Sequence, residues 1–156
     1  MKAQFQNALG MRVAAEICRA MKPACVKLCV AGSLRRRKPL VGDVEVLYVA
    51  QLETRPDPDN MFGSLVVNLA DEVIATLEKS RVLGRRKNVN GSEMFGPLNK
   101  LMFHVETGMP VDLFSVPTAT CPCVLLEKNG QRDLPTLPER VQNQISQGND
   151  YQKTNS

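Results

Sequence analysis

One stretch, residues 31–49 (AGSLRRRKPLVGDVEVLYV), constrains this chain more than any other. It begins with a Gly-Ser pair directly after an apolar run, continues through four consecutive basic residues, and ends in a segment that alternates acidic and apolar residues. Alternation with a period of two predicts a strand whose two faces differ in polarity. The stretch therefore predicts a strand over residues 26–31, a polar turn, and a second strand over residues 44–49.

Asp43 and Glu45 stand two positions apart in the second of these strands. Their side chains should share one face, while Val44 and Val46 point to the other. Neighbouring carboxylates repel each other unless a cation lies between them. Mg²⁺ prefers such hard oxygen ligands and usually takes one or two protein carboxylates plus phosphate oxygens. An isolated pair of this kind is more often the solvated face of an edge strand, so the residues around it decide the interpretation.

The turn before the carboxylates has the composition of a phosphate-binding loop. Gly32 and Ser33 would expose backbone N–H groups and a hydroxyl, which can hold phosphate oxygens. Residues 35–38 (RRRK) supply positive charge, and the arginine fork matches phosphate geometry. Pro39 prevents a helix from continuing, and Gly42 permits a tight approach to the acidic strand. A basic run alone is most often a solvated patch, but here it lies between a Gly-Ser turn and a carboxylate pair.

The pattern G-S-x-R-R followed by G-D-x-[DE] resembles the signature of the family X DNA polymerases, within the polymerase-β-like nucleotidyltransferase superfamily. A later acidic residue, Asp112, matches the third carboxylate of that family. The resemblance implies that Asp43, Glu45 and Asp112 are the catalytic and metal-binding residues, with two ions of Mg²⁺ or Mn²⁺ as cofactors. It implies a nucleotide-binding set of four residues: Gly32, Ser33, Arg36 and Gly42.

The same resemblance implies a (d)NTP and DNA, as a primer–template or gapped duplex, as partners. It spans roughly residues 26–116 and reaches weakly to Gly130. Glu45 stands where the polymerases usually carry Asp, and Pro110 stands where they often carry Arg. We expect residues 1–117 to form a palm-like domain. Residues 118–156 look like a remnant of the connection to a thumb and a polar, disordered tail, and a partner chain that supplies a thumb is one possibility.

The remaining periodicities predict an α+β fold: a mixed sheet of about five strands with two helices on one face. The helices are expected over residues 3–21 and 62–79, where apolar residues recur every three to four positions. Residues 51–60, with two prolines, are expected to form a polar loop. Further strands are expected over residues 81–89, 98–106 and 109–116, and the last two should form a hairpin that brings Asp112 near the carboxylate pair.

Composition narrows the possible functions. The formal net charge of +4 is compatible with nucleic acid but does not require it. The five cysteines form no pair of zinc knuckles, so we expect reduced thiols, buried at Cys18, Cys25 and Cys29, and no zinc. The first ten residues lack an apolar signal core, and no stretch has the length of a membrane span, which predicts a cytoplasmic protein.

Three functions remain open on the sequence. The first is DNA-directed nucleotidyl transfer of the family X type. The second is a thumbless palm that binds nucleotide or DNA without extending a primer. The third is a minimal nucleotidyltransferase whose acceptor is RNA, a protein or a small molecule. Consumption of nucleotide separates the second from the others, and dependence on a template separates the first from the third.

Overall fold

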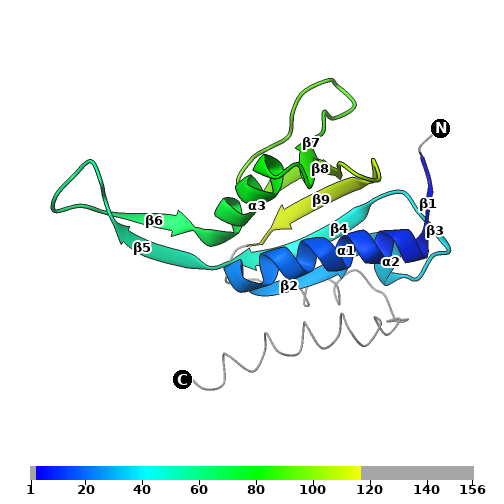
Figure 1. Ribbon diagram of the computed structural model, residues 1–156, viewed down its shortest axis with the longest axis horizontal. Coiled ribbons are helices and arrows are strands. Elements are labelled where there is room, and N and C mark those ends of the chain that lie inside the picture. Colours follow the sequence, from blue (N-terminus) through cyan, green and yellow to red (C-terminus); the bar gives the residue numbers. More distant parts are fainter. Residues whose placement is uncertain (1–2, 117–156) are drawn as a thin grey trace, which may run out of the picture.

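A computed structural model of the protein describes residues 3–116 (Figure 1). The elements are β1 (Phe5–Gln6), α1 (Asn7–Met21), a short 3-10 helix η1 (Lys22–Ala24), β2 (Cys25–Ala31), α2 (Gly32–Arg35), β3 (Leu40–Val41), β4 (Val44–Ala50), β5 (Leu52–Pro56), β6 (Ser64–Asn68), α3 (Leu69–Lys79), β7 (Leu83–Arg85), β8 (Asn99–His104) and β9 (Pro110–Ser115). The expected thumb remnant and tail at 118–156 lie outside the described residues.

Five strands form the central sheet, in the order β2-β4-β9-β8-β7. β4 and β9 run parallel, and every other neighbouring pair is antiparallel. Parallel neighbours need a long crossover connection, and here the chain between them contains α3 and two further strands of the sheet. The predicted class, a mixed five-strand sheet in an α+β fold, is confirmed.

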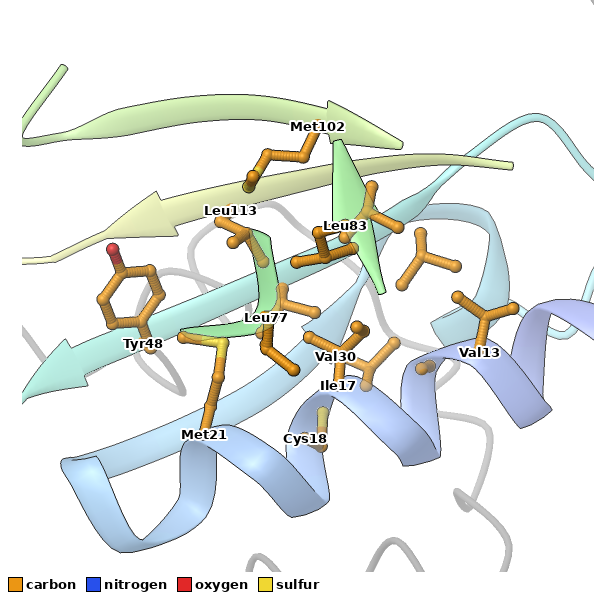
Figure 2. Packing of buried hydrophobic residues seen from close by; sticks show 14 of the residues in the cluster. Val13, Ile17, Cys18, Met21, Val30, Tyr48, Leu77, Leu83, Met102 and Leu113 are labelled. Carbon is orange, nitrogen blue, oxygen red and sulfur yellow. The ribbon is translucent and has the colours of Figure 1, made fainter. Parts of the chain in front are cut away.

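The core lies between the two longer helices and one face of the sheet (Figure 2). Ile17 of α1 and Ile74 of α3 are fully buried, together with alternate residues of the central strands. The first five residues of β4 alternate: Val44, Val46 and Tyr48 are fully buried, whereas the two residues between them are half-buried. The helices therefore cover one face, as expected, and Glu45, the acidic residue of β4, is directed to the other face.

Helix α1 begins at Asn7 rather than at residue 3. Phe5 and Gln6 instead pair with Val41 and Leu40 of β3. The side-chain amide of Asn7 donates to the backbone oxygen of Lys38 at 2.8 Å, so the start of the helix is attached to the basic turn. The apolar spacing alone does not reveal this attachment, because it depends on a segment more than thirty residues away.

Two predictions over residues 51–79 were wrong. The expected loop 51–60 contains β5, which pairs with β6 in an antiparallel hairpin, and the expected helix 62–79 begins only at Leu69. Asn68 caps α3, because its side-chain oxygen accepts the N–H of Asp71 at 3.0 Å. The residues just before the cap, Leu65, Val66 and Val67, favour strands and have an available partner strand. Figure 1 shows this hairpin projecting from the end of the sheet.

The remaining expected strands are present with shorter bounds. The strand expected over residues 81–89 is limited to Leu83–Arg85, because Arg81 takes a left-handed backbone (φ 59°) at the end of α3. The hairpin of β8 and β9 is confirmed, with Leu101 opposite Asp112. His104, the only histidine, is buried and bonds to Thr107 Oγ1 at 2.9 Å and Glu16 Oε2 at 3.2 Å, which joins β8 to α1.

The described cysteines are free thiols, as expected. Cys18 and Cys29 are buried and Cys25 is half-buried. Burial raises the pKa of both the Cys18 and Cys25 thiols to about 12, so each stays protonated at neutral pH and is a poor nucleophile. Over residues 3–116, none of the helices has both the length and the apolar character needed to cross a bilayer.

Candidate functional site

The face of the sheet opposite the helices carries the predicted carboxylates. Glu45 and Asp112 are direct Cα partners in the parallel pair of β4 and β9. Residues aligned across neighbouring strands share a face, so the two side chains stand next to each other. Asp43 immediately precedes β4, and Gly42 forms the bend before it. All three carboxylates thus belong to one end of two adjacent central strands.

Gly32 brings the Gly-Ser turn against Glu45. Its backbone is left-handed (φ +66°), and a Cβ placed there would overlap Oε2 of Glu45 and lie 2.8 Å from Cδ. Only glycine combines that conformation with so close an approach. Ala31, the residue before the turn, is also the direct partner of Glu45 on the neighbouring strand. The Gly-Ser turn and the Glu45 carboxylate therefore lie against each other.

Replacing Gly32 by alanine should lower the free energy of unfolding by more than its backbone conformation alone explains. The left-handed backbone costs a residue with a Cβ about 1–2 kcal/mol, and the overlap with Glu45 adds to that cost. Gly108→Ala is the matched control, because Gly108 is also left-handed (φ +71°) but has nothing within 4 Å of its added Cβ. Urea denaturation of both variants measures the difference.

The double variant Gly32→Ala with Glu45→Ala tests the origin of that extra cost. Removing the Glu45 carboxylate should return the destabilisation by Gly32→Ala to that of Gly108→Ala. Equal losses for Gly32→Ala and Gly108→Ala in the presence of Glu45 would show that the Glu45 side chain gives way to the added methyl group without a measurable cost.

The turn over residues 32–38 is held by its own backbone. Arg36 N–H donates to Gly32 O at 3.2 Å, and Lys38 N–H donates to Ser33 O at 3.1 Å. Within the described part of the chain, two buried side-chain atoms have no hydrogen-bond partner, Ser33 Oγ and Nη2 of Arg35. Unpaired buried polar groups are costly, and a polar ligand at the turn would remove that cost. Ser33 therefore has the properties expected of a ligand contact.

The four basic residues of the turn are not equivalent. Arg36, the predicted phosphate contact, is exposed, whereas Arg35 is 5% exposed. A buried guanidinium without a partner for Nη2 is unusual, because burying a charge is expensive unless it is paired. Arg35 was not among the residues selected from the sequence. The basic run gave no indication which of its members would be buried.

Arg86 contacts Asp112 of the candidate site, although the sequence did not predict it as a site residue. Its Nη2 pairs with Oδ1 of Asp112, and the side chains are 30% and 13% exposed. The sequence placed this arginine only within the strand expected over residues 81–89, since nothing in the local pattern points to a carboxylate 26 positions later. Over residues 3–116, no three His, Cys, Asp or Glu side chains are gathered closely enough to hold a metal ion.

The donor set still has the chemistry that Mg²⁺ or Mn²⁺ requires. The three groups are carboxylates, and two of them are neighbours on the same face of adjacent strands. The Glu45 carboxylate also lies against the turn whose Ser33 hydroxyl lacks a partner. Side-chain movement of Asp112, which now faces Arg86, would be needed to complete a three-carboxylate site. We conclude that the residues fit divalent ions, although the described arrangement does not gather them.

Comparison with known proteins supports the fold. No protein-family model matches the sequence, and no curated protein matches it. Among solved structures, the chain is similar to Leishmania infantum polymerase β in a ternary P/T complex, with 19% identity and a TM-score of 0.50 over 83% of this chain and 49% of that one. A second structure of that polymerase, a ternary gap complex, matches with 21% identity and a TM-score of 0.48 over 81% and 41%.

The chain spans less than half the length of these polymerases. At such low identity, the likeness speaks for the arrangement of the backbone and not for an activity. The sheet order, the helices on one face and the first of these similarities agree with one another. The described chain thus has a fold similar to that of polymerase β.

Proposed function

We propose that this protein is a nucleotidyltransferase of the family X DNA polymerase type, which transfers a nucleotide from a (d)NTP to a 3′-hydroxyl. The observation that carries the proposal is the contact between Gly32 and Glu45. It joins a turn with an unpaired buried Ser33 hydroxyl to a pair of carboxylates on adjacent strands. A phosphate-binding turn beside hard oxygen ligands is what transfer of a phosphoryl-linked group needs.

In this proposal the chain's own residues divide the work. Asp43, Glu45 and Asp112 would hold two divalent ions. Bound ions would make the acceptor hydroxyl easier to deprotonate and would neutralise charge on the leaving pyrophosphate. Two further residues would hold the triphosphate: the Ser33 hydroxyl as a hydrogen-bond donor and the exposed Arg36 guanidinium as a counter-charge.

The acceptor is proposed to be DNA, because the motif resembles the DNA-polymerase branch and the solved neighbour is a polymerase β. A labelled (d)NTP, a gapped DNA duplex and Mg²⁺ or Mn²⁺ provide the test. Template-directed addition to the primer is expected. Addition that ignores the template, or labelling of RNA or protein in place of DNA, would replace this function by transfer to another acceptor.

One observation favours a second candidate, a palm that binds nucleotide without transferring it. Asp112 is paired with Arg86, and the described residues gather no three ligands for an ion. The same assay separates the two candidates. Protein that binds (d)NTP in equilibrium dialysis but consumes none in the presence of Mn²⁺ and gapped DNA would support the binding module and refute transfer.

A further inference from the structure

Arg86 and Asp112 form a largely shielded ion pair on the face of the sheet opposite the helices. Nη2 of Arg86 pairs with Oδ1 of Asp112, whose side chain is only 13% exposed. Nε of the same guanidinium donates to the backbone oxygen of Met102 at 3.4 Å. Charge-assisted hydrogen bonds are stronger than neutral ones, and shielding from water removes the screening that weakens surface pairs.

Backbone register explains how Arg86 reaches the acidic site. The N–H of Arg86 donates to Leu101 O at 3.0 Å, which continues the pairing of β7 with β8 by one residue. Leu101 is the partner of Asp112, and Asp112 is the partner of Glu45. These four residues form one row across the face opposite the helices, and the guanidinium of Arg86 spans the position of Leu101 to reach Asp112, the first carboxylate of the row.

We propose that Arg86 is the counter-ion of Asp112 in the metal-free protein and that a divalent ion must displace it. This inference rests on the proposed function, because it assumes that Asp112 is a metal ligand. A guanidinium and a divalent cation on one carboxylate repel each other at short range. The described residues gather no three ligands for an ion, and one of the three proposed ligands, Asp112, is paired with Arg86. Arg86 is thus a positioning residue that prevents a metal site from forming until an ion competes for Asp112.

Displacement of Arg86 by the ion predicts an effect on metal affinity that a purely structural role of Arg86 would not produce. If Arg86 pairs with Asp112 only in the metal-free state, its removal destabilises that state and leaves the metal-bound state unchanged. The apparent affinity for the ion then rises by the factor by which the competent arrangement becomes more populated. An arginine with a purely structural role would stabilise the metal-free and the metal-bound states equally. Its removal would then leave the affinity for the ion unchanged.

The test is a titration of the full chain with Mn²⁺ in the absence of nucleotide. The electron paramagnetic resonance signal of free Mn²⁺ measures how much of the ion is bound. Arg86→Gln should bind Mn²⁺ about tenfold more tightly than the wild type. It should melt at a lower temperature in chelator, and saturating Mn²⁺ should remove that difference. Lys87→Gln is the matched control, because Lys87 is the adjacent exposed residue and its loss changes the net charge equally.

Asp112→Asn shows whether the measured Mn²⁺ binding occurs at this site, because this variant should no longer bind the ion. Equal affinity of Arg86→Gln and the wild type would overturn the inference and leave the proposed function standing. Weaker binding by Arg86→Gln would also overturn it, because Arg86 would then orient Asp112 toward the ion. No binding by either protein would overturn the inference, whereas the proposed function is decided separately by incorporation into the gapped duplex, where nucleotide phosphates complete the ligands of the ion. If Arg86→Gln does not fold, Arg86→Lys replaces it, with a smaller gain in affinity expected from a less complementary cation.

Discussion

Asp43→Ala should reduce metal-dependent incorporation of labelled nucleotide into a gapped DNA duplex by about a thousandfold. The carboxylate stands directly before β4, two positions from Glu45, at the end of the strand that pairs with β9. Its removal would leave the ions with fewer hard oxygen ligands at the position where charge develops on the transferred phosphate. Initial rates with Mg²⁺ and with Mn²⁺ measure the loss.

The control for this prediction is Asp59→Ala. Asp59 is an exposed carboxylate in the turn of the β5–β6 hairpin, so its removal changes the net charge by the same amount outside the proposed site. It should retain wild-type rates, and circular dichroism should show both variants folded. Incorporation by folded Asp43→Ala at the rate of Asp59→Ala would refute the assignment of Asp43 as a catalytic ligand.

Leu113→Ala should have the largest effect on stability among the substitutions considered, a loss of about 3 kcal/mol in the free energy of unfolding. Leu113 is fully buried on β9, the middle strand of the sheet, and belongs to the core that both long helices cover. A domain of this size is stabilised by only about 5–15 kcal/mol in total. Chemical denaturation of the purified chain gives the difference directly.

Leu52→Ala is the matched comparison, because it removes the same atoms from β5, where the side chain is 57% exposed. Its expected cost is under about 1 kcal/mol. Similar losses for both leucines would mean that the β5–β6 hairpin contributes to the core as much as the central sheet does.

That hairpin is also where local pattern and tertiary structure diverge most. Residues 62–68 satisfy a helical spacing when joined to α3, but Leu65 and Val66 face Arg55 and Thr54 across a strand pair. Arg55 also forms a two-pronged ion pair with Glu72 of α3 at 2.7 and 3.2 Å, which attaches the hairpin to the helix. A strand partner and this ion pair lie outside any local window, so periodicity alone favoured the wrong structure.

The existence of the later strands was easier to predict than their bounds. β8 and β9 alternate buried and half-buried residues around a turn, and the sequence carries that alternation plainly. The prediction for the strand at Leu83–Arg85 was too long. It began too early because the left-handed backbone of Arg81 follows α3 and delays the start of the strand. A non-glycine residue in that conformation has no signal in the sequence.

The sequence by itself determined the α+β class, the central strands and the grouping of Gly32 and Ser33 with the acidic residues of β4. These features are local: they depend on a period of two, on glycine and on charges close together in the chain. Register decided the rest. Asp112 lies beside Glu45 because β9 pairs with β4 in parallel, and Arg86 reaches Asp112 because β7 is carried past its end along β8. A shift of one residue would turn each of these side chains to the other face, and only the packed core excludes it.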